Sequence, residues 1–173
     1  MNYKEIFEEL VICKLKGVMF HSEMIDYYAF LDCNKLKAKH HKEMLHDLDA
    51  VHAIKDYYLL NYKELIELDL TKANIKNYIP ANWNKNIISG EERYQYITEG
   101  MEIYYDWEEE TCEHLQKLAD ELFELKHYDD YLFVRDLKET NMIEKSRAHN
   151  LRTYIEQIGM SFDTDTGFKY KLD

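Results

Sequence analysis

The sequence predicts an all-α fold, an up-down bundle of four long helices with one long crossover between the second and the third. Apolar residues recur at the helical period over four long segments. The chain has 5 glycines and 1 proline among 173 residues, too few for the turns of a β-sandwich or barrel. The apolar fraction of 46% and the charged fraction of 32% are those of a globular chain, and the length suits one domain.

The predicted bundle occupies residues 1–158, and an irregular tail follows over residues 159–173. The periodic segments predict helices over residues 3–31, 35–68, 91–125 and 129–158. Short links join the first helix to the second and the third to the fourth. Links of this kind force each pair of helices into an antiparallel hairpin.

The connection between the two hairpins is much longer. Residues 69–88 contain Pro80 and Trp83 and lack a helical stripe. A connector of this length is uncommon in a compact domain unless it crosses the domain. We therefore expect it to travel along the bundle and to return the third helix parallel to the second. Ser89 and Glu92 have the capping-box spacing expected at the start of that third helix.

The acidic composition excludes several classes of protein. The chain has 22 Lys and Arg and 34 Asp and Glu, which gives a formal net charge of −12. An acidic protein repels the phosphates of nucleic acid, so nucleic acid is an unfavourable ligand. The basic stretch at residues 35–42 is interpreted as a solvated helix face rather than a DNA contact. No segment approaches the roughly 20 apolar residues of a membrane span, and the N-terminus lacks signal-peptide features. Three scattered cysteines indicate reduced thiols, so we expect a cytoplasmic, intracellular protein.

Each predicted helix places an ionisable side chain within its apolar stripe. In chain order these are His21, Glu43, Glu108 and Glu144. Within each hairpin the two residues lie at nearly equal distances from the turn, 12 and 10 residues in the first and 18 and 18 in the second. At 1.5 Å per residue, the members of each pair match in height within about half a helical turn.

Buried unpaired charges cost several kcal/mol each, so these carboxylates require a partner. The candidates are a metal ion, the guanidinium of Arg147 on the same face of the fourth helix, or protonation. Two further residues are candidates for the surroundings of the site. Asp47 is placed to orient an imidazole, and Tyr104 is placed to donate a hydrogen bond to a buried carboxylate.

The pattern resembles the ferritin-like di-metal carboxylate proteins, in which two helices each supply a Glu and two supply Glu-x-x-His. The second helix matches with Glu43-x-x-His46 and the third with Glu108. The fourth has Glu144-x-x-Arg147, and the first has His21 where the family has glutamate. The resemblance implies a ferritin-like bundle with one or two Fe- or Mn-type ions. The implied ligands are His21, Glu43, His46, Glu108 and Glu144. A guanidinium cannot bind a cation, so Arg147 departs from the family pattern.

Two functions from different classes remain open. In the first, the carboxylate and histidine cluster binds metal, and oxidation chemistry follows from the resemblance. In the second, the bundle is a non-enzymatic interaction protein whose polar core is held by Arg147, Glu108 and Glu144. No Ser-His-Asp or Cys-His nucleophile arrangement is present, so the sequence leaves open whether the chain is an enzyme.

A looser resemblance bears on the second function. Four short motifs are similar to segments of small phage and prophage proteins of Gram-positive bacteria, namely residues 20–24, 41–43, 79–83 and 107–111. This resemblance carries no assigned activity and adds only a phage or mobile-element context. The net charge of −12 and the incomplete ligand set motivate a host protein as the partner, such as a defence or nucleic-acid-binding protein. An acidic surface speeds association with basic partners. Self-association through a helix face is the other expected contact.

Overall fold

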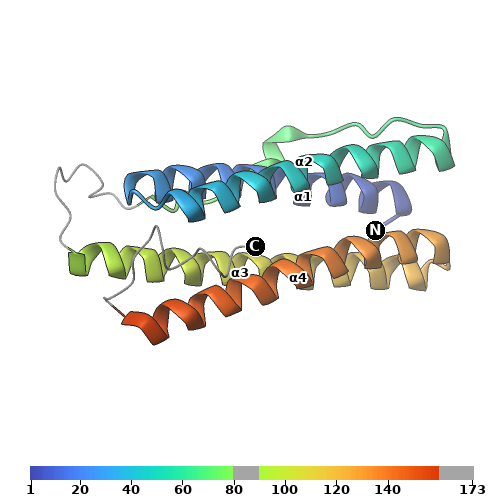
Figure 1. The fold of residues 1–173 in the computed structure, drawn as a ribbon. Helices are drawn as coiled ribbons and strands as arrows, with labels where there is room; N and C mark the ends of the chain where they lie inside the picture. Colours follow the sequence, from blue (N-terminus) through green and yellow to red (C-terminus); the bar gives the residue numbers. More distant parts are fainter. Residues whose placement is uncertain (80–89, 160–173) are drawn as a thin grey trace.

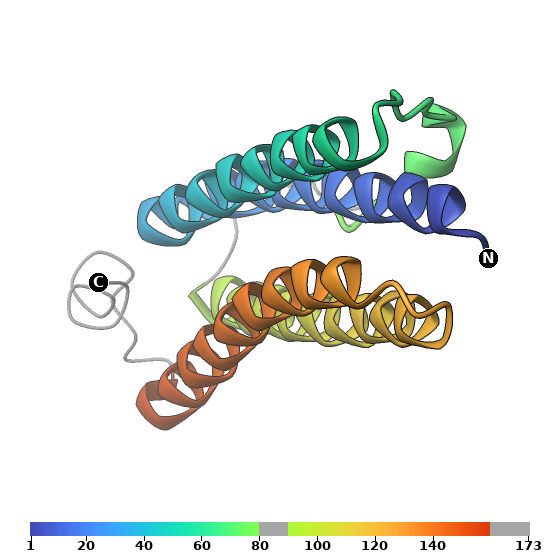
Figure 2. The ribbon, with the colours of Figure 1, turned by 90° about the vertical axis from the view of Figure 1, so that its right-hand side faces the viewer.

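The structure is a computed structural model that describes residues 1–79 and 90–159. Its elements are α1 (Tyr3–Phe30), α2 (Asn34–Tyr62), the short 3₁₀ helix η1 (Leu70–Ala73), α3 (Gly90–Glu124) and α4 (Tyr128–Ile158). Within those two ranges no residue forms a strand. Helix α1 pairs with α2 and α3 with α4, and the two hairpins pack together as two layers (Figures 1 and 2). Helices α2 and α3 run in the same direction (Figure 1), which confirms the predicted all-α bundle with one long crossover.

Local sequence signals set the ends of the helices. The side chain of Asn2 accepts a hydrogen bond from the backbone of Glu5, and Glu5 reciprocates, which forms a capping box at the start of α1. Asp32 and Lys126 both adopt positive φ, and this left-handed conformation reverses the chain within each short hairpin turn. Arg93 of α3 donates to the carbonyl oxygens of residues 31 and 32, at 2.7 and 3.0 Å, and so connects the first turn to the second hairpin.

Helix α2 ends at Tyr62, six residues before the predicted end at residue 68. Lys63 adopts the left-handed conformation with φ of 59°, and its N–H donates to the carbonyl oxygen of Leu59. The chain leaves the helix there, and Ile66 turns into the apolar core, where it is buried. The crossover then packs against α1 through η1. Pro80, Trp83, Ser89 and the tail after residue 159 lie outside the described residues.

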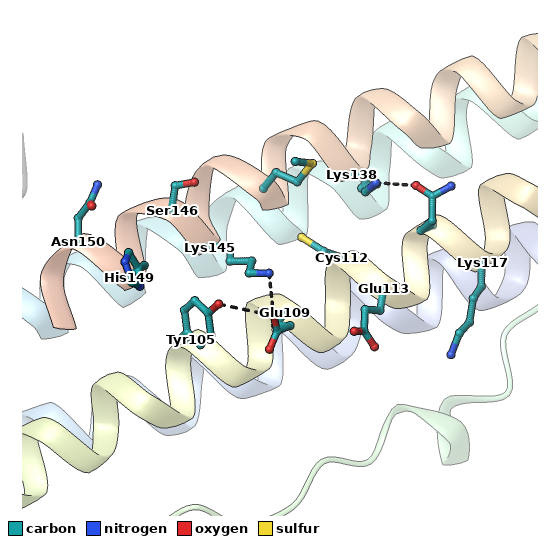
Figure 3. Close-up of a pocket in the computed structure, with 12 residues that line it drawn as sticks. Tyr105, Glu109, Cys112, Glu113, Lys117, Lys138, Lys145, Ser146, His149 and Asn150 are labelled. Atoms are coloured by element: carbon teal, nitrogen blue, oxygen red, sulfur yellow. Dashed lines mark hydrogen bonds and ion pairs between the residues drawn. The ribbon is translucent and has the colours of Figure 1, made fainter. Parts of the chain in front are cut away.

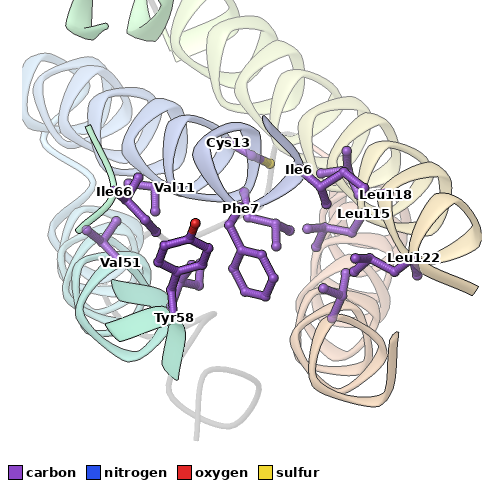
Figure 4. Packing of buried hydrophobic residues seen from close by; sticks show 14 residues of the cluster. Ile6, Phe7, Val11, Cys13, Val51, Tyr58, Ile66, Leu115, Leu118 and Leu122 are labelled. Atoms are coloured by element: carbon purple, nitrogen blue, oxygen red, sulfur yellow. The ribbon is translucent and has the colours of Figure 1, made fainter. Parts of the chain in front are cut away.

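The apolar core consists of two clusters, one toward each end of the bundle. The first is built around Phe7, Tyr58 and Leu115 (Figure 4), and the second around Phe20, Tyr28 and Tyr104. Each cluster draws residues from both hairpins, so burial of apolar surface holds the hairpins together from both ends.

At one end of the bundle a polar contact supplements this packing. Asp130 of α4 is buried and accepts hydrogen bonds from Tyr57, at 2.9 Å, and from Tyr62. His127 lies 3.0 Å from the same carboxylate. These contacts tie the C-terminal end of α2 to the N-terminal end of α4, and thereby fix the relative height of the two helices.

Between the two apolar clusters lies a layer of buried polar residues, which we call the polar layer. Its members are Lys14, His21, His40, Glu43, Asp47, Glu108, Asn141 and Glu144. Helical spacings of three and four residues place them on the inward faces of all four helices. The three cysteines are free, and no described helix is long and apolar enough to cross a membrane.

Gly17 makes room for the polar layer. A Cβ atom at this position would lie 2.1 Å from Oδ2 of Asp47. The carboxylate cannot move away without loss of a contact, because Lys14 donates a hydrogen bond to its Oδ1. We expect Gly17→Ala to displace Asp47 and to lower the free energy of unfolding by about 1–3 kcal/mol, the usual cost of overpacking. Gly90→Ala is the matched control, because a Cβ there meets no atom within 4 Å. Urea denaturation of both variants measures the effect, and equal stability would show that Asp47 is not fixed in this position.

Candidate functional site

The polar layer surrounds a cavity of about 100 Å³ at the centre of the bundle. All four helices contribute to its lining, which comprises Lys14, His21, Glu43, His46, Asp47, Ala50, Glu108, Leu137, Thr140, Asn141 and Glu144. The five residues that the sequence predicts as metal ligands therefore all border one cavity. Three of its neighbours, Lys14, Lys39 and Asn141, were not predicted, and they determine its electrostatics.

Lys14 of α1 lies at the centre of the first hydrogen-bonded group. Its side chain is 5% exposed, and Nζ donates to Oδ1 of Asp47 at 2.9 Å and to Oδ1 of Asn141 at 2.6 Å. The amide nitrogen of Asn141 in turn donates to Oε2 of Glu108 at 2.9 Å. One ammonium group thus joins α1 to α2 and α4 directly, and to α3 through the amide.

Lys39 of α2 lies at the centre of the second group. Its Nζ is 3.1 Å from Oε1 of Glu43 and 3.0 Å from Oε2 of Glu144. Glu144 also accepts a hydrogen bond from the hydroxyl of Tyr104, at 3.2 Å, and one from Arg147, at 2.5 Å. Arg147 approaches from the surface, where about half of its side chain is exposed. Glu144 is therefore surrounded by donors from three helices.

Two buried histidines of the polar layer, His21 and His40, contact each other. Nδ1 of His21 and Nδ1 of His40 lie 2.9 Å apart, so one proton is shared between the two rings. Burial lowers the pKa of His21 to about 3 and that of His40 well below its usual range, which keeps both rings neutral at neutral pH. Nε2 of His21 faces Asp47 and Glu108 at 3.7 and 3.8 Å.

Two histidines of α2 take different positions. His46, one of the implied ligands, lies on the rim of the cavity, where its side chain is 48% exposed and its Nδ1 is 3.4 Å from Glu43. His40, which the predicted ligand set leaves out, is fully buried and stacks on Tyr28. The reason is helical phase, because residues 40, 43 and 47 share one face of α2 and residue 46 lies beside it.

Burial and the neighbouring charges set the protonation states. Burial raises the pKa of Glu108 to about 8, so this carboxyl is protonated at neutral pH. Burial also raises the pKa values of Glu43 and Asp47, against the attraction of the lysines. At Glu144 burial is outweighed by Lys39, and the pKa falls below its usual range. The pKa of Lys14 rises because attraction to Asp47 exceeds the effect of burial.

Cationic side chains of the same chain contact the acidic groups of the polar layer. Lys39 is bonded to Glu43 and Glu144, Lys14 to Asp47, and Arg147 to Glu144. These contacts offset the cost of burying the carboxylates.

This arrangement does not fit the two-metal centre implied by the resemblance. Among the described residues, no group of three or more His, Cys, Asp and Glu side chains is placed to hold a metal ion. Oxygens of Asp47, Glu43 and Glu144 accept from ammonium groups. The fourth helix has Arg147 where the family pattern requires a histidine after Glu144. Lys14 and Lys39 are bonded to the carboxylates that a metal cation would have to bind.

A sequence signal for Lys14 and Asn141 does exist. Lys14 falls on the same inward stripe as Leu10, Gly17 and His21, at spacings of four and three residues. Asn141 precedes Glu144 by three residues on the inward face of α4. A lysine in an apolar stripe predicts a buried ion pair, but its partners lie on other helices and are not identified by local spacing.

A larger hollow lies on the outer surface between α3 and α4. This groove has a volume of about 980 Å³, and its walls carry Tyr105, Cys112, Met142 and His149 (Figure 3). Lys145 crosses it to reach Glu109 at 2.8 Å. None of the predicted site residues lines this groove.

Comparison with known proteins supports the fold. No family model and no curated protein matches the sequence, so the resemblance to phage and prophage proteins finds no support. A humanised archaeal ferritin aligns with a TM-score of 0.77 and 13% identity, over 99% of this chain and 95% of that chain. An engineered closed form of the Archaeoglobus fulgidus ferritin gives 0.75 and 11%, over 99% and 96%. An open-pore ferritin from the same archaeon gives 0.70 and 12%, over 92% and 88%. The chain has the ferritin-like four-helix bundle fold.

The buried carboxyl of Glu108 predicts a dependence of stability on pH. Its pKa is about 8 in the folded chain against an ordinary 4.5, so the folded state keeps a proton that the unfolded state loses. The contribution of Glu108 to the free energy of unfolding is fully present below pH 4.5. It is lost as the pH rises to about 8, by up to about 1.4 kcal/mol per pH unit.

Glu108→Gln mimics the protonated acid and should remove this loss. The groups that face residue 108 are Lys14, His21, Asp47, Asn141 and Glu144, and they remain in the variant. The free energies of unfolding of wild type and variant, measured from pH 5 to pH 8, should diverge steadily in favour of Glu108→Gln. The control is Glu110→Gln, at an exposed position two residues along the same helix. Its free energy of unfolding should change with pH in the same way as that of wild type. Parallel curves for Glu108→Gln as well would show that this carboxyl is ionised in the fold.

Proposed function

We propose that this ferritin-like bundle works without a resident metal, as a non-enzymatic protein whose central cation sites are filled by its own lysines. The observation that carries the proposal is the buried ammonium of Lys14, bonded to Asp47 and Asn141 at the height where His21 and Glu108 also meet. Function then resides in the shape and surface of the bundle, and iron oxidation or storage is not expected.

Electrostatics supports this proposal. A cation at the cavity would lie beside Lys14 and Lys39, both of which are bonded to the carboxylates that would have to bind it. Binding would require those ion pairs to break and the ammonium groups to find new partners in a buried layer, which is costly. Arg147 adds a third positive charge at Glu144.

The competing function is the metal site predicted from the sequence, with His21, Glu43, His46, Glu108 and Glu144 as ligands and Fe or Mn as the ion. One observation favours it, since all five residues border the same cavity of about 100 Å³. Carboxylate oxygens and imidazole nitrogens are suitable ligands for these metals. In that case the two lysines would move aside when the ion enters.

Surface chemistry indicates a partner for the non-enzymatic function. With a net charge of −12, the bundle attracts basic surfaces at long range. Met142 and Ile143 of α4 are about half exposed, which adds apolar contact area beside the groove between α3 and α4. A host protein or a second copy of the chain would both satisfy this chemistry. Light scattering coupled to size-exclusion chromatography distinguishes a monomer from a homo-oligomer.

Metal content decides between the two functions. We expect protein purified without chelator or His tag to contain far less than one equivalent of metal, and its melting temperature to be unchanged by added Fe(II) or Mn(II). Elemental analysis and thermal denaturation are the measurements. One or two equivalents, lost in Glu43→Ala and Glu108→Ala, would overturn the proposal and establish the predicted ligand set.

A lysine substitution tests the same point in the opposite direction. Lys14→Glu replaces the buried cation by a carboxylate and leaves Asp47 beside a like charge. We expect the metal-free variant to melt well below wild type, and added Mn(II) to recover part of the loss, because a cation is now missing from the polar layer. Lys16→Glu, at a half-buried position nearby, is the control and should not respond to Mn(II). A wild type and Lys14→Glu variant of equal stability would contradict the assigned role of Lys14.

A further inference from the structure

Helix α2 carries leucines on the face that is turned away from the core. Opposite its buried face, residues recur at alternating spacings of three and four, and all of them are exposed. We call this set the outer stripe, and it comprises Ala38, His41, Leu45, Leu48, His52, Lys55 and Leu59. The solvent face of a surface helix is normally polar. Here Leu45, Leu48 and Leu59 are 44%, 39% and 42% exposed, so the stripe is apolar where polar residues are expected.

The spacing of the outer stripe is that of a helix-pairing seam. Alternating steps of three and four residues are the heptad repeat, which keeps apolar side chains turned toward a second helix over many turns. Helix α2 already packs on α1 through its opposite, buried face. A helix that covers the outer stripe must therefore come from outside the described part of the chain.

A row of charges beside the stripe indicates what that helix is. Lys35, Lys42, Asp49 and Asp56 are exposed and lie seven residues apart, so they share one flank of the stripe. The first two are basic and the last two acidic. The flank is therefore complementary to itself when a second copy of α2 lies beside it in the opposite direction, whereas parallel pairing would place the two basic ends together.

We propose that two copies of the chain pair through the outer stripes of their α2 helices, antiparallel and related by a two-fold axis. The axis passes between residues 46 and 47, so Leu45 of each copy lies opposite Leu48 of the other. His41 then lies opposite His52 of the second copy and extends the seam by one layer. This is an isologous contact, in which one surface meets itself.

The same alignment brings opposite charges together on the flank. Lys42 lies within two residues, or about 3 Å along the helix, of the height of Asp49 of the second copy. Lys35 has the same relation to Asp56 of the second copy. The two-fold axis repeats both pairs. A net charge of −12 on each chain opposes association at long range, and these pairs offset that repulsion at the contact itself.

This dimer deepens the proposed function, on which it rests for the surface as the working part of the molecule. It names a second copy of the chain as the partner. It also places the contact on α2, on a different helix from the groove between α3 and α4. The polar layer is not involved, because the outer stripe lies on the opposite face of α2 from Glu43 and Asp47.

Sedimentation velocity of the full-length protein tests the pairing. The expected wild-type mass at high micromolar concentration is twice the chain mass of 21.0 kDa. Leu45→Lys should weaken the dimer by about tenfold or more, because it places a charge at the centre of the seam. Leu132→Lys on α4 is the matched control, since Leu132 is 43% exposed, and it should sediment like wild type.

Exchange of the flanking charges tests the antiparallel alignment. Lys42→Glu and Asp49→Lys should each weaken the dimer, because each places like charges opposite one another. A mixture of these two variants should form a heterodimer that is tighter than either homodimer, because both opposite-charge pairs are then restored. Both positions are exposed, so circular dichroism should show folded variants. A mixture no tighter than the separate variants would overturn the alignment.

A wild type that remains monomeric at high micromolar concentration would overturn the dimer. So would a dimer that Leu45→Lys leaves intact and that Ile143→Lys dissociates, because the contact would then lie on α4. Metal content of the same samples is measured separately. A metal-free monomer would leave the proposed function intact and remove only the dimer, whereas a metal-loaded dimer would remove the proposed function and leave the contact on α2.

Discussion

Four helices enclose a layer of buried ionisable groups, and the requirement that these groups neutralise one another constrains the rest of the structure. Lys14 satisfies part of that requirement, because its ammonium reaches Asp47 and Asn141, and Asn141 donates to Glu108. Lys39 satisfies another part, because it contacts Glu43 and Glu144. Gly17 must lack a side chain for Asp47 to enter. The apolar clusters on either side exclude water and thereby strengthen each polar contact between them.

The same requirement supports the proposal that this ferritin-like bundle works without a resident metal. In di-metal bundles the cations neutralise carboxylates that the helices bring together. Here the chain supplies its own cations through Lys14, Lys39 and Arg147, and burial protonates Glu108. The likeness to archaeal ferritins is one of fold.

The sequence predicts the fold and most of the residues that border the cavity. The residues that it does not identify were missed for physical reasons. Helical periodicity and the scarcity of glycine and proline predict the bundle, and similar distances from the turns match His21 with Glu43, and Glu108 with Glu144, in height. Helix α2 ends early because Lys63 adopts a left-handed conformation. A lysine does not predict this conformation, as a glycine or asparagine would. Lys39 falls in the stretch interpreted as a solvated helix face, but it contacts Glu43 of its own helix and Glu144 of α4. Lys14 bonds to Asp47 and Asn141, which lie on other helices and are not identified by local spacing. His46, one of the implied ligands, lies on the rim, whereas His40 is fully buried.

The central claim is that the ammonium of Lys14 takes the place of a metal cation, and a double-mutant cycle tests it most directly. Urea denaturation of metal-free wild type, Lys14→Met, Asp47→Asn and the double variant gives the coupling between the two side chains. The account predicts that Lys14→Met alone costs about 3–5 kcal/mol, because it leaves Asp47 buried without a partner, and that the double variant recovers much of this. A Lys14→Met variant within about 0.5 kcal/mol of wild type, as for an ordinary surface lysine, would contradict the account.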